Sequence, residues 1–260
     1  MTTDTRPKLV SKTYSGLSKN FTITGIAKGA GMIHPNMATM LSVIATDCNV
    51  SPSCLDHAVK YATEKSFNSI TIDGDTSTND TFAVLANGMS GVSEINSTQS
   101  KEFQYFCDSL TEVATDLAKL IVRDGEGVTK FVVIKVEGAQ TVSQAKKVAE
   151  SIAKSSLVKT AFFGQDANWG RIICAAGYSG EDIIPQKVNM WFGSTEEGLN
   201  ELHLVKNGEP FDTNEERASS ILKEKDFRVR VNLGLGDQSA TVYTCDLSVE
   251  YVNINADYRS

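Results

Sequence analysis

The chain has 260 residues, 41% hydrophobic and 22% charged, a balance typical of a globular protein of one large domain or two smaller ones. Its 25 basic and 32 acidic residues give a formal net charge of −7, which disfavours a general nucleic-acid binder or a protein docked on anionic membranes. Five scattered cysteines without a C-x-x-C pair predict buried thiols and no disulfide framework or zinc site. We expect neither a membrane span nor a secretory signal, because no apolar run approaches about 18 residues and the N-terminal residues lack an apolar core.

The first half of the chain combines short strands with two helices. Ser51 followed by Pro52 predicts a helix that ends near Lys65. Apolar residues spaced three and four apart predict a longer helix over 98–123, followed by a glycine-containing break. Apolar alternation and β-branched residues predict strands over 21–26, 37–47, 68–73, 80–86 and 131–136.

The pattern changes after Gly138, where helices and strands follow one another to the end of the chain. The predicted helices cover 142–156, 169–177 and 213–224, with an irregular segment over 157–168. The predicted strands cover 187–192, 226–233 and 240–252. The sequence therefore predicts a mixed α/β fold of two units, with a boundary near residues 136–141.

Familiar catalytic and metal-binding motifs are absent from the sequence. The acidic loop 73–80 lacks the glycine and glutamate of a calcium-binding EF-hand, so it is interpreted as a turn with Asx and Thr backbone bonds. The glycines of 25–31 do not match a phosphate-binding loop, and the lone S-x-x-K at 151–154 lacks its partner motifs. No two of the three histidines have the spacing of metal ligands, and no metal site is predicted.

The segment KGAGMIHPNMATML, residues 28–41, leads a glycine-rich loop into a predicted strand with Thr39 near the junction. A threonine hydroxyl can attack the peptide bond before it, and hydrolysis of the resulting ester frees an N-terminal threonine. The new α-amine has a reference pKa of about 7.7–8.0, so it can serve as a base beside its own hydroxyl. From the residues alone, an ordinary strand-forming threonine explains the same pattern.

The same segment resembles the self-cleavage segment of the glutamate N-acetyltransferase family, also called ornithine acetyltransferases, of arginine biosynthesis. Other segments resemble that family in the same order along the chain: MTTDT (1–5), SFNSITIDGDTSTNDTFAVLANG (66–88), LAKLIVRDGEGVTKF (117–131), AFFGQDANWGRIICAAG (161–177) and YVNINADYRS (251–260). Because they cover nearly the whole chain, the chain is identified as a member of this family.

The resemblance implies cleavage between Ala38 and Thr39, which leaves Thr39 as the N-terminal nucleophile of a β chain ending at Ser260. It implies a ping-pong reaction, in which N-acetylornithine acetylates the Thr39 hydroxyl and glutamate then takes the acetyl group. Many members also make N-acetylglutamate from acetyl-CoA, so acetyl-CoA is expected as a second co-substrate. No bound cofactor or metal is expected.

The family's substrate-binding positions fall on polar residues spread along the chain. Lys28 can bind a carboxylate and Glu126 an ammonium group, whereas hydroxyl and amide groups satisfy the remaining polar atoms of an amino acid. The implied substrate-binding residues are Thr2 (or its neighbour Thr3), Lys28, Thr39, Glu126, Asn255 and Ser260.

The resemblance also implies a fold and partners. The expected fold is a layered α/β sandwich of the N-terminal-nucleophile kind over residues 1–136, followed by a smaller α/β domain over 137–260 whose tail reaches the active site. The expected partner is the α chain of the same precursor, in a heterotetramer of two α and two β chains. A fungal member is expected in the mitochondrial matrix and a bacterial one in the cytoplasm.

One departure from the family keeps two alternatives open. Members carry a much longer segment before the cleavage point, whereas 38 residues precede Thr39 here, and the family's oxyanion-stabilising Thr-Gly pair has no match. The chain could therefore be a catalytically silent fragment with exposed sheet edges. It could also be a self-cleaving amidase or aminopeptidase relative, although Lys28 and Glu126 suit an amino-acid donor better than a peptide.

Overall fold

The computed structural model describes residues 3–34, 40–212 and 214–257. Helices and strands of the chain fall into two compact units, which confirms the predicted mixed α/β class. Unit 1 consists of Met1–Ile70 and Gly74–Gly125, and unit 2 of Thr71–Asp73 and Glu126–Ser260. The boundary expected after residue 136 lies inside strand β5 (Phe131–Ala139).

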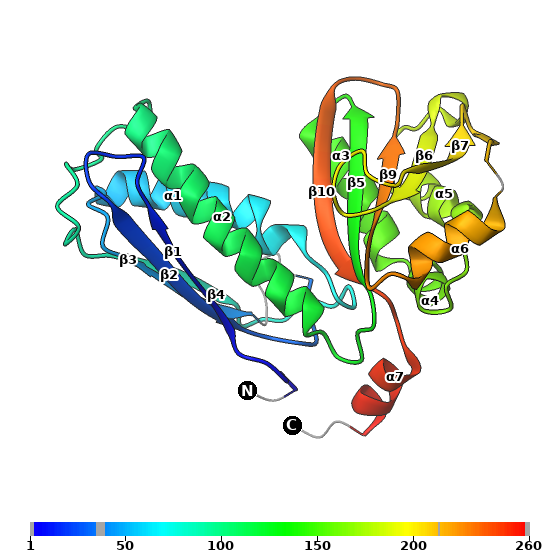
Figure 1. Cartoon of the computed structure of the whole chain (residues 1–260), viewed down its shortest axis with the longest axis horizontal. Coiled ribbons are helices and arrows are strands. Elements are labelled where there is room, and N and C mark those ends of the chain that lie inside the picture. The colour runs from blue at the N-terminus through cyan, green and yellow to red at the C-terminus, as the bar shows by residue number, and fades with distance from the viewer. Residues whose placement is uncertain (1–2, 35–39, 213, 258–260) are drawn as a thin grey trace. The chain divides into compact units, whose positions relative to one another are not determined.

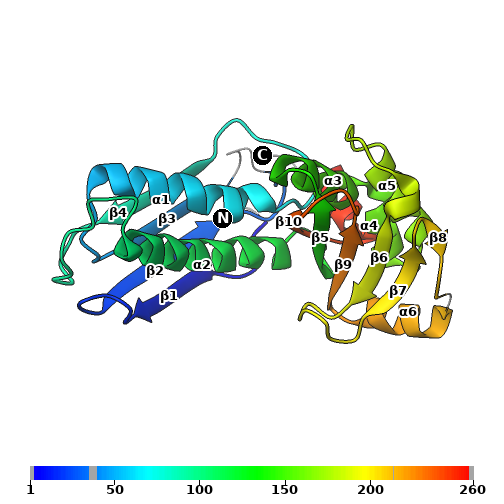
Figure 2. The ribbon, with the colours of Figure 1, turned by 90° about the horizontal axis from the view of Figure 1, so that it is seen from above.

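Unit 1 is a four-stranded sheet with two helices on one face (Figure 1). The sheet order is β1-β2-β3-β4, with antiparallel neighbours except for the parallel pair β3 and β4. Figure 2 shows α1 and α2 alongside each other over this sheet. The elements are β1 (Lys8–Tyr14), β2 (Phe21–Lys28), β3 (Leu41–Thr46), α1 (Pro52–Lys65), the 3-10 helix η1 (Phe67–Ser69), β4 (Thr81–Ala86) and α2 (Lys101–Arg123).

Both helices of unit 1 begin after a serine cap, of which the sequence predicts the one before Pro52. The Ser51 hydroxyl accepts from the N–H of Cys54, and the Ser100 hydroxyl accepts from the N–H of Phe103. Each bond satisfies a backbone donor that the first helical turn leaves unpaired. The apolar stripe of α2 is buried, so packing on the sheet and not local propensity alone stabilises this long helix.

The other face of the unit 1 sheet is apolar and exposed. Leu9, Ile26 and Val43 lie directly opposite one another on β1, β2 and β3. Leu41 and Leu85 lie on the same face, and the five side chains are between 41% and 63% exposed. Contiguous exposed apolar faces of this kind are typical of interaction surfaces.

Unit 2 is a six-stranded sheet packed against four helices. The sheet order is β10-β5-β9-β6-β7-β8, and only β5 and β9 are parallel among the described pairs. Apolar residues of α3 to α6 and of the sheet form one core. Besides β5, the elements are α3 (Val142–Lys154), α4 (Ser156–Phe163), α5 (Trp169–Gly177), η2 (Pro185–Lys187), β6 (Asn189–Gly193), β7 (Leu202–Lys206), β8 (Glu209–Pro210), α6 (Glu215–Lys223), β9 (Asp226–Asn232), β10 (Gln238–Cys245) and α7 (Val249–Ala256).

The predicted strand over 68–73 is wrong. Residues Phe67–Ser69 form η1, because the Asn68 amide and the Ser69 hydroxyl bond back to Glu64 at the end of α1. The segment after η1 then joins unit 2, where the N–H of Thr71 donates to the carbonyl of Tyr243 at 3.0 Å. Local side-chain bonds outweigh the strand propensity of this segment.

Two further predictions for unit 2 differ from the structure. The segment 157–168 is not irregular throughout, because Ser155 caps the short helix α4. The strand predicted over 240–252 ends at Cys245, and Ser248 caps α7 instead. Strands β1, β7 and β8 are not among the predicted elements. Of these three, only β1 has side chains that alternate between more buried and more exposed along the strand.

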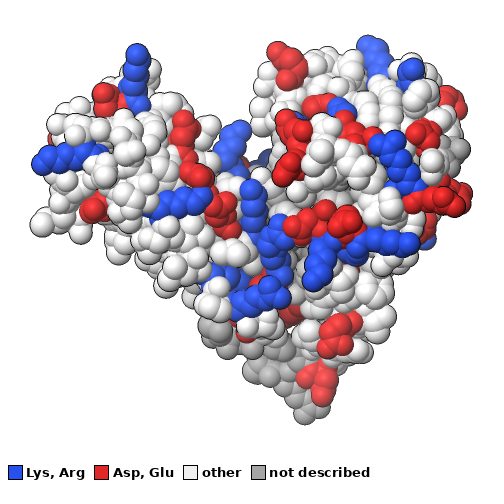
Figure 3. Space-filling model, viewed as in Figure 1, with Lys and Arg blue, Asp and Glu red and all other residues white. Residues whose placement is uncertain are grey.

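Charged residues on unit 2 are arranged in opposite-sign pairs. The Arg230 guanidinium donates to Glu137 at 2.7 Å and to Glu201 at 2.7 Å, and it stacks on Trp191 with 3.7 Å to the ring centroid. Figure 3 shows acidic and basic side chains intermixed on this unit. Such mixing differs from the basic stripe of a nucleic-acid binder. In the ranges that the structure describes, no helix combines the length and apolar character needed to cross a membrane.

Candidate active site

The predicted site residues fall into two groups. Lys28 is described in unit 1, and Glu126 and Asn255 are described in unit 2. The other predicted positions lie outside the described residues: Thr2, Ala38, Thr39 and Ser260.

Lys28 is the last residue of β2 and lies half-buried opposite Leu41, the first residue of β3. Leu41 follows Thr39 by two residues in the sequence. The next residue, Gly29, has a φ of +141° and donates its N–H to Asp4 at 2.8 Å. Glycine adopts such a φ without a Cβ penalty, so the chain leaves the sheet directly after Lys28.

Asp80 lies at the same end of the sheet, immediately before β4. One oxygen of its carboxylate accepts the N–H of Met40, the residue that follows Thr39. Burial raises the pKa of Asp80 to about 6, although the Met40 N–H and the nearby charge of Lys28 oppose this rise. The other carboxylate oxygen is buried and has no hydrogen-bond partner in the described part of the chain. A perturbed carboxyl in such a place is a candidate for proton transfer.

A buried ion triad centres on Lys8 of β1. Its ammonium lies 2.5 Å from a carboxylate oxygen of Asp4 and 2.6 Å from one of Asp124, and all three side chains are at most 3% exposed. Burial raises the pKa of both carboxyls, but hydrogen bonds and the Lys8 charge outweigh it and keep both below the usual 3.8. Asp124 also accepts from the Thr5 hydroxyl and N–H, so the triad joins the N-terminal segment to the end of α2.

Glu126 and Asn255 are brought together in unit 2. The Asn255 side-chain amide donates to a Glu126 carboxylate oxygen at 2.7 Å and to the Tyr251 carbonyl at 3.0 Å. Glu126 is 9% exposed, so its carboxylate is largely removed from water. A carboxylate held in this way is suited to bind an ammonium group.

The approach of α7 to Glu126 depends on Gly127. The Ser248 hydroxyl donates to the Gly127 carbonyl at 2.6 Å and also caps α7 by accepting from the N–H of Tyr251. Gly127 has a φ of +66°, and a Cβ there would lie 2.5 Å from the Tyr251 nitrogen. Only glycine therefore permits this approach, which places Asn255 beside Glu126.

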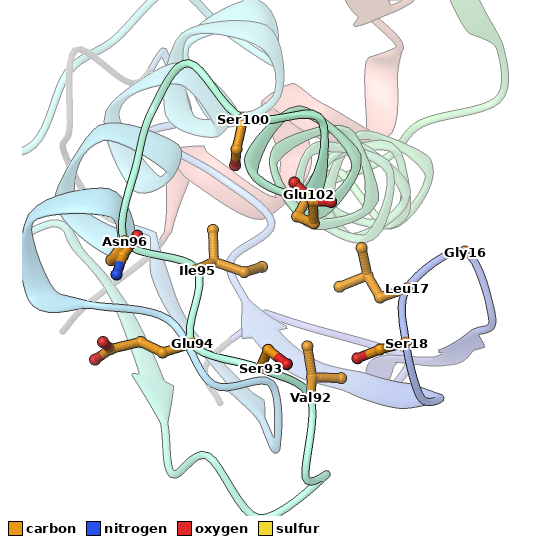
Figure 4. A pocket seen from close by; sticks show the side chains of 10 residues that line it. All are labelled: Gly16, Leu17, Ser18, Val92, Ser93, Glu94, Ile95, Asn96, Ser100 and Glu102. Atoms are coloured by element: carbon orange, nitrogen blue, oxygen red, sulfur yellow. The ribbon is translucent and has the colours of Figure 1, made fainter.

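A surface cavity of about 350 Å³ in unit 1 contains none of the predicted site residues. It lies between the β1–β2 turn, the loop before α2 and the start of α2, with Glu94 and Glu102 at its wall (Figure 4). Lys28 lies at the opposite end of β2 from this turn.

The described residues contain no cluster of three or more His, Cys, Asp or Glu side chains that could hold a metal ion. All five cysteines are free thiols. Four are buried as predicted, whereas Cys174 is exposed on α5.

Sequence reasoning missed Asp80 and the Lys8 triad. The sequence analysis interprets the acidic loop as a turn, and the signal that could have singled out Asp80 is its place as the first residue of the strand predicted over 80–86. Its proximity to Met40 depends on the parallel pairing of β3 with β4, which one sequence does not reveal. The triad joins residues more than 110 positions apart in the sequence, and no local pattern marks it.

Comparison with known proteins shows the family to which the chain is similar. Residues 1–260 match the family model described as "ArgJ family". A protein of Fusarium vanettenii named "Arginine biosynthesis bifunctional protein ArgJ, mitochondrial" is 52% identical over all of this chain and 60% of its own length. A protein of Dictyostelium discoideum with the same name is 48% identical over all of this chain and 61% of its own length. The chain thus spans about three fifths of the length of these relatives.

A crystal structure of arginine biosynthesis bifunctional protein ArgJ from Bacillus halodurans resembles the present fold. It superposes with a TM-score of 0.79 at 41% sequence identity, and the match covers 85% of this chain and 100% of that one. At this identity the likeness extends beyond the fold to the family. The chain belongs to the ArgJ family.

Proposed function

We propose that the protein transfers an acetyl group from N-acetylornithine to glutamate in arginine biosynthesis, with Thr39 as the nucleophile. The observation that carries this proposal is the pairing of Glu126 with Asn255, two residues 129 positions apart that the family resemblance assigns to one substrate. The names of the relatives, which refer to arginine biosynthesis, support the same function.

The first half-reaction forms an acetyl ester on Thr39. The freed α-amine of Thr39 takes the hydroxyl proton while the hydroxyl oxygen attacks the acetyl carbonyl of N-acetylornithine. The tetrahedral intermediate expels the ornithine nitrogen, which takes that proton and leaves as an amine. In the second half-reaction, the glutamate amine attacks the ester, the Thr39 oxygen regains a proton, and N-acetylglutamate leaves.

Lys28 and Glu126 supply opposite charges for an amino-acid ligand. We assign the substrate carboxylate to Lys28 and the side-chain ammonium of ornithine to Glu126, which Asn255 orients. Thr2 and Ser260 are proposed to contact the remaining polar atoms. Acetyl-CoA is proposed as a second acetyl donor, and no bound cofactor is required by these steps.

The exposed apolar face of unit 1 supports the proposed α-chain partner. Leu9, Ile26 and Leu85 are more than half exposed on that face. About two fifths of each relative's length lies outside the part that this chain matches. We propose that the α chain covers this face, in a heterotetramer of two α and two β chains. The names of the relatives favour a mitochondrial location for the assembly.

The charged substrate contacts are testable by steady-state kinetics of the assembled enzyme. Lys28→Met and Glu126→Gln each remove one charge-assisted hydrogen bond, a loss of about 1.5–3 kcal/mol, and should raise the KM for N-acetylornithine about 10- to 100-fold. The exposed residues Lys101 and Glu94 offer matched controls, because Lys101→Met and Glu94→Gln make the same changes away from the site. An unchanged KM for N-acetylornithine in both site variants would show that neither Lys28 nor Glu126 binds the substrate.

A further inference from the structure

Glu126 and Asn255, the carboxylate–amide pair, come from two different segments of unit 2. Glu126 lies in the loop that leads to β5, and Asn255 is the next-to-last residue of α7. The pair can orient a bound ammonium group only while the two segments keep a fixed separation, because a hydrogen bond weakens steeply when its geometry is lost. The contacts that join these segments therefore decide how well the pair binds.

Helix α7 has little packing of its own to hold it in place. None of its residues, Val249–Ala256, all of which the structure describes, is buried. Two of its apolar side chains, Val249 and Val252, are 64% and 58% exposed. A helix of 8 residues is marginal in water without tertiary packing, so the position of α7 depends on its hydrogen bonds.

The Ser248 hydroxyl joins the start of α7 to the residue after Glu126. It donates to the Gly127 carbonyl at 2.6 Å and accepts the N–H of Tyr251 at 3.2 Å, so one side chain holds both the loop and the N-terminus of the helix. Ser248 is 5% exposed, so water does not readily replace either bond. This contact lies one residue away from the carboxylate of the carboxylate–amide pair.

A second contact fixes the other ends of the same two segments. The Asp246 carboxylate accepts the N–H groups of Thr129 and Lys130, each at 2.9 Å, and the Thr129 hydroxyl also donates to it. Asp246 is buried, which favours these bonds over bonds to water. The contacts between the two segments therefore follow one another in order, from Asp246 through Ser248 to the carboxylate–amide pair.

We propose that Ser248 is a positioning residue of the substrate site, which acts on the substrate ammonium through the carboxylate–amide pair. The inference rests on the proposed function, in which Glu126 binds the side-chain ammonium of ornithine. Without the Ser248 hydroxyl, the start of α7 is no longer held to Gly127. Asn255 then lacks the fixed position from which it orients the Glu126 carboxylate. The contacts of Asp246 remain, so the change is one of position and not a loss of the fold.

The test is a calorimetric titration of ornithine into the assembled enzyme. Ornithine carries the side-chain ammonium but no acetyl group, so it binds without acetylating the enzyme. Ser248→Ala should raise the Kd for ornithine about 3- to 10-fold, the usual effect of one hydrogen bond. Ser248→Gly removes the same hydroxyl with less cost to the helix cap and should show the same rise, whereas Ser248→Thr keeps the hydroxyl and should restore most of the affinity.

A double-mutant cycle separates positioning from a general loss of stability. In an Asn255→Ala background Ser248 no longer has an amide to position, so adding Ser248→Ala should leave the Kd for ornithine unchanged. A general loss of stability would instead weaken binding by the same factor in both backgrounds. In steady-state kinetics, Ser248→Ala should lower kcat/KM for N-acetylornithine and leave kcat/KM for glutamate unchanged, because glutamate has no side-chain ammonium.

Ser100→Ala is the matched control. The Ser100 hydroxyl caps α2 with the same two kinds of bond, because it accepts the N–H of Phe103 at 3.0 Å and donates to the Ser97 carbonyl at 3.0 Å. Its carbonyl partner lies three residues before it in the same segment and not in a loop that carries a substrate residue. Ser100→Ala therefore removes a helix cap as Ser248→Ala does, but it should leave the Kd for ornithine at the wild-type value.

The outcomes separate the inference from the function on which it rests. An unchanged Kd in a folded Ser248→Ala or Ser248→Gly variant would overturn the positioning role, and so would an equal loss with and without Asn255→Ala, even where the wild type transfers acetyl groups. A wild-type enzyme that binds ornithine with the expected coupling but transfers no acetyl group would sustain the inference and contradict the proposed function. A wild-type enzyme that binds no ornithine would overturn both.

Discussion

Thr39→Ala is expected to abolish both self-cleavage and acetyl transfer. Alanine has no hydroxyl to attack the Ala38 carbonyl, so no N-terminal amine is freed, and no acetyl ester can form at residue 39. Enzymes that lose their nucleophile commonly lose about 10⁴-fold or more in rate. The cleavage is measured by intact mass, and the transfer by the appearance of N-acetylglutamate.

Thr39→Ser is the control for this variant, because serine retains the hydroxyl and the α-amine. It should still cleave and still transfer the acetyl group at a measurable rate. If Thr39→Ala were cleaved at the same bond, or transferred acetyl groups as fast as Thr39→Ser, another residue would be the nucleophile and the account would fail.

Lys8→Met is expected to lower the free energy of unfolding by about 3–5 kcal/mol, the usual cost of removing one partner from a buried ion pair. The Lys8 ammonium lies between the Asp4 and Asp124 carboxylates, whose side chains are at most 3% exposed. Without the cation, two like charges remain buried. Urea unfolding followed by circular dichroism measures the loss.

The pH dependence of this loss has a definite sign. In the wild type the pKa values of Asp4 and Asp124 are lowered, so their contribution to stability is present above the usual 3.8 and is lost as the pH falls below it. In Lys8→Met the ammonium no longer offsets the effect of burial, so the pKa values of Asp4 and Asp124 rise. The two carboxylates are then protonated more easily, and the difference in unfolding free energy between the variant and the wild type should shrink as the pH falls from 7 toward 4.

Lys60→Met is the matched control for Lys8→Met. The pair of Lys60 with Asp56 has a similar distance of 2.7 Å, but its side chains are 75% and 58% exposed. Exposed pairs typically contribute about 0–1 kcal/mol. A loss in Lys8→Met no larger than the loss in Lys60→Met would show that the triad does not stabilise the fold.

Local patterns predicted most helices and several strands, because caps and apolar spacing act over a few residues. The Ser51–Pro52 start of α1 and the apolar stripe of α2 are examples. The failures arose where side chains bond to nearby backbone. Ser248 caps α7 and ends a segment whose composition favours a strand, and Ser69 bonds back to the end of α1.

The candidate site was predictable only in part. The resemblance to a known family identified Glu126 and Asn255, and the structure brings these two side chains into contact. Asp80 was not predictable, because its contact with Met40 requires the order and register of two parallel strands. The Lys8 triad likewise depends on long-range packing and not on spacing along the chain.

The most direct test of the central claim is the mass of the β chain after the assembled enzyme is mixed with N-acetylornithine in the absence of glutamate. The account predicts that the fragment 39–260 gains the mass of one acetyl group, located on Thr39 by peptide sequencing, and loses it when glutamate is added. A fragment that transfers acetyl groups but never carries one, or carries it on another residue, would contradict Thr39 as the acetyl-carrying nucleophile.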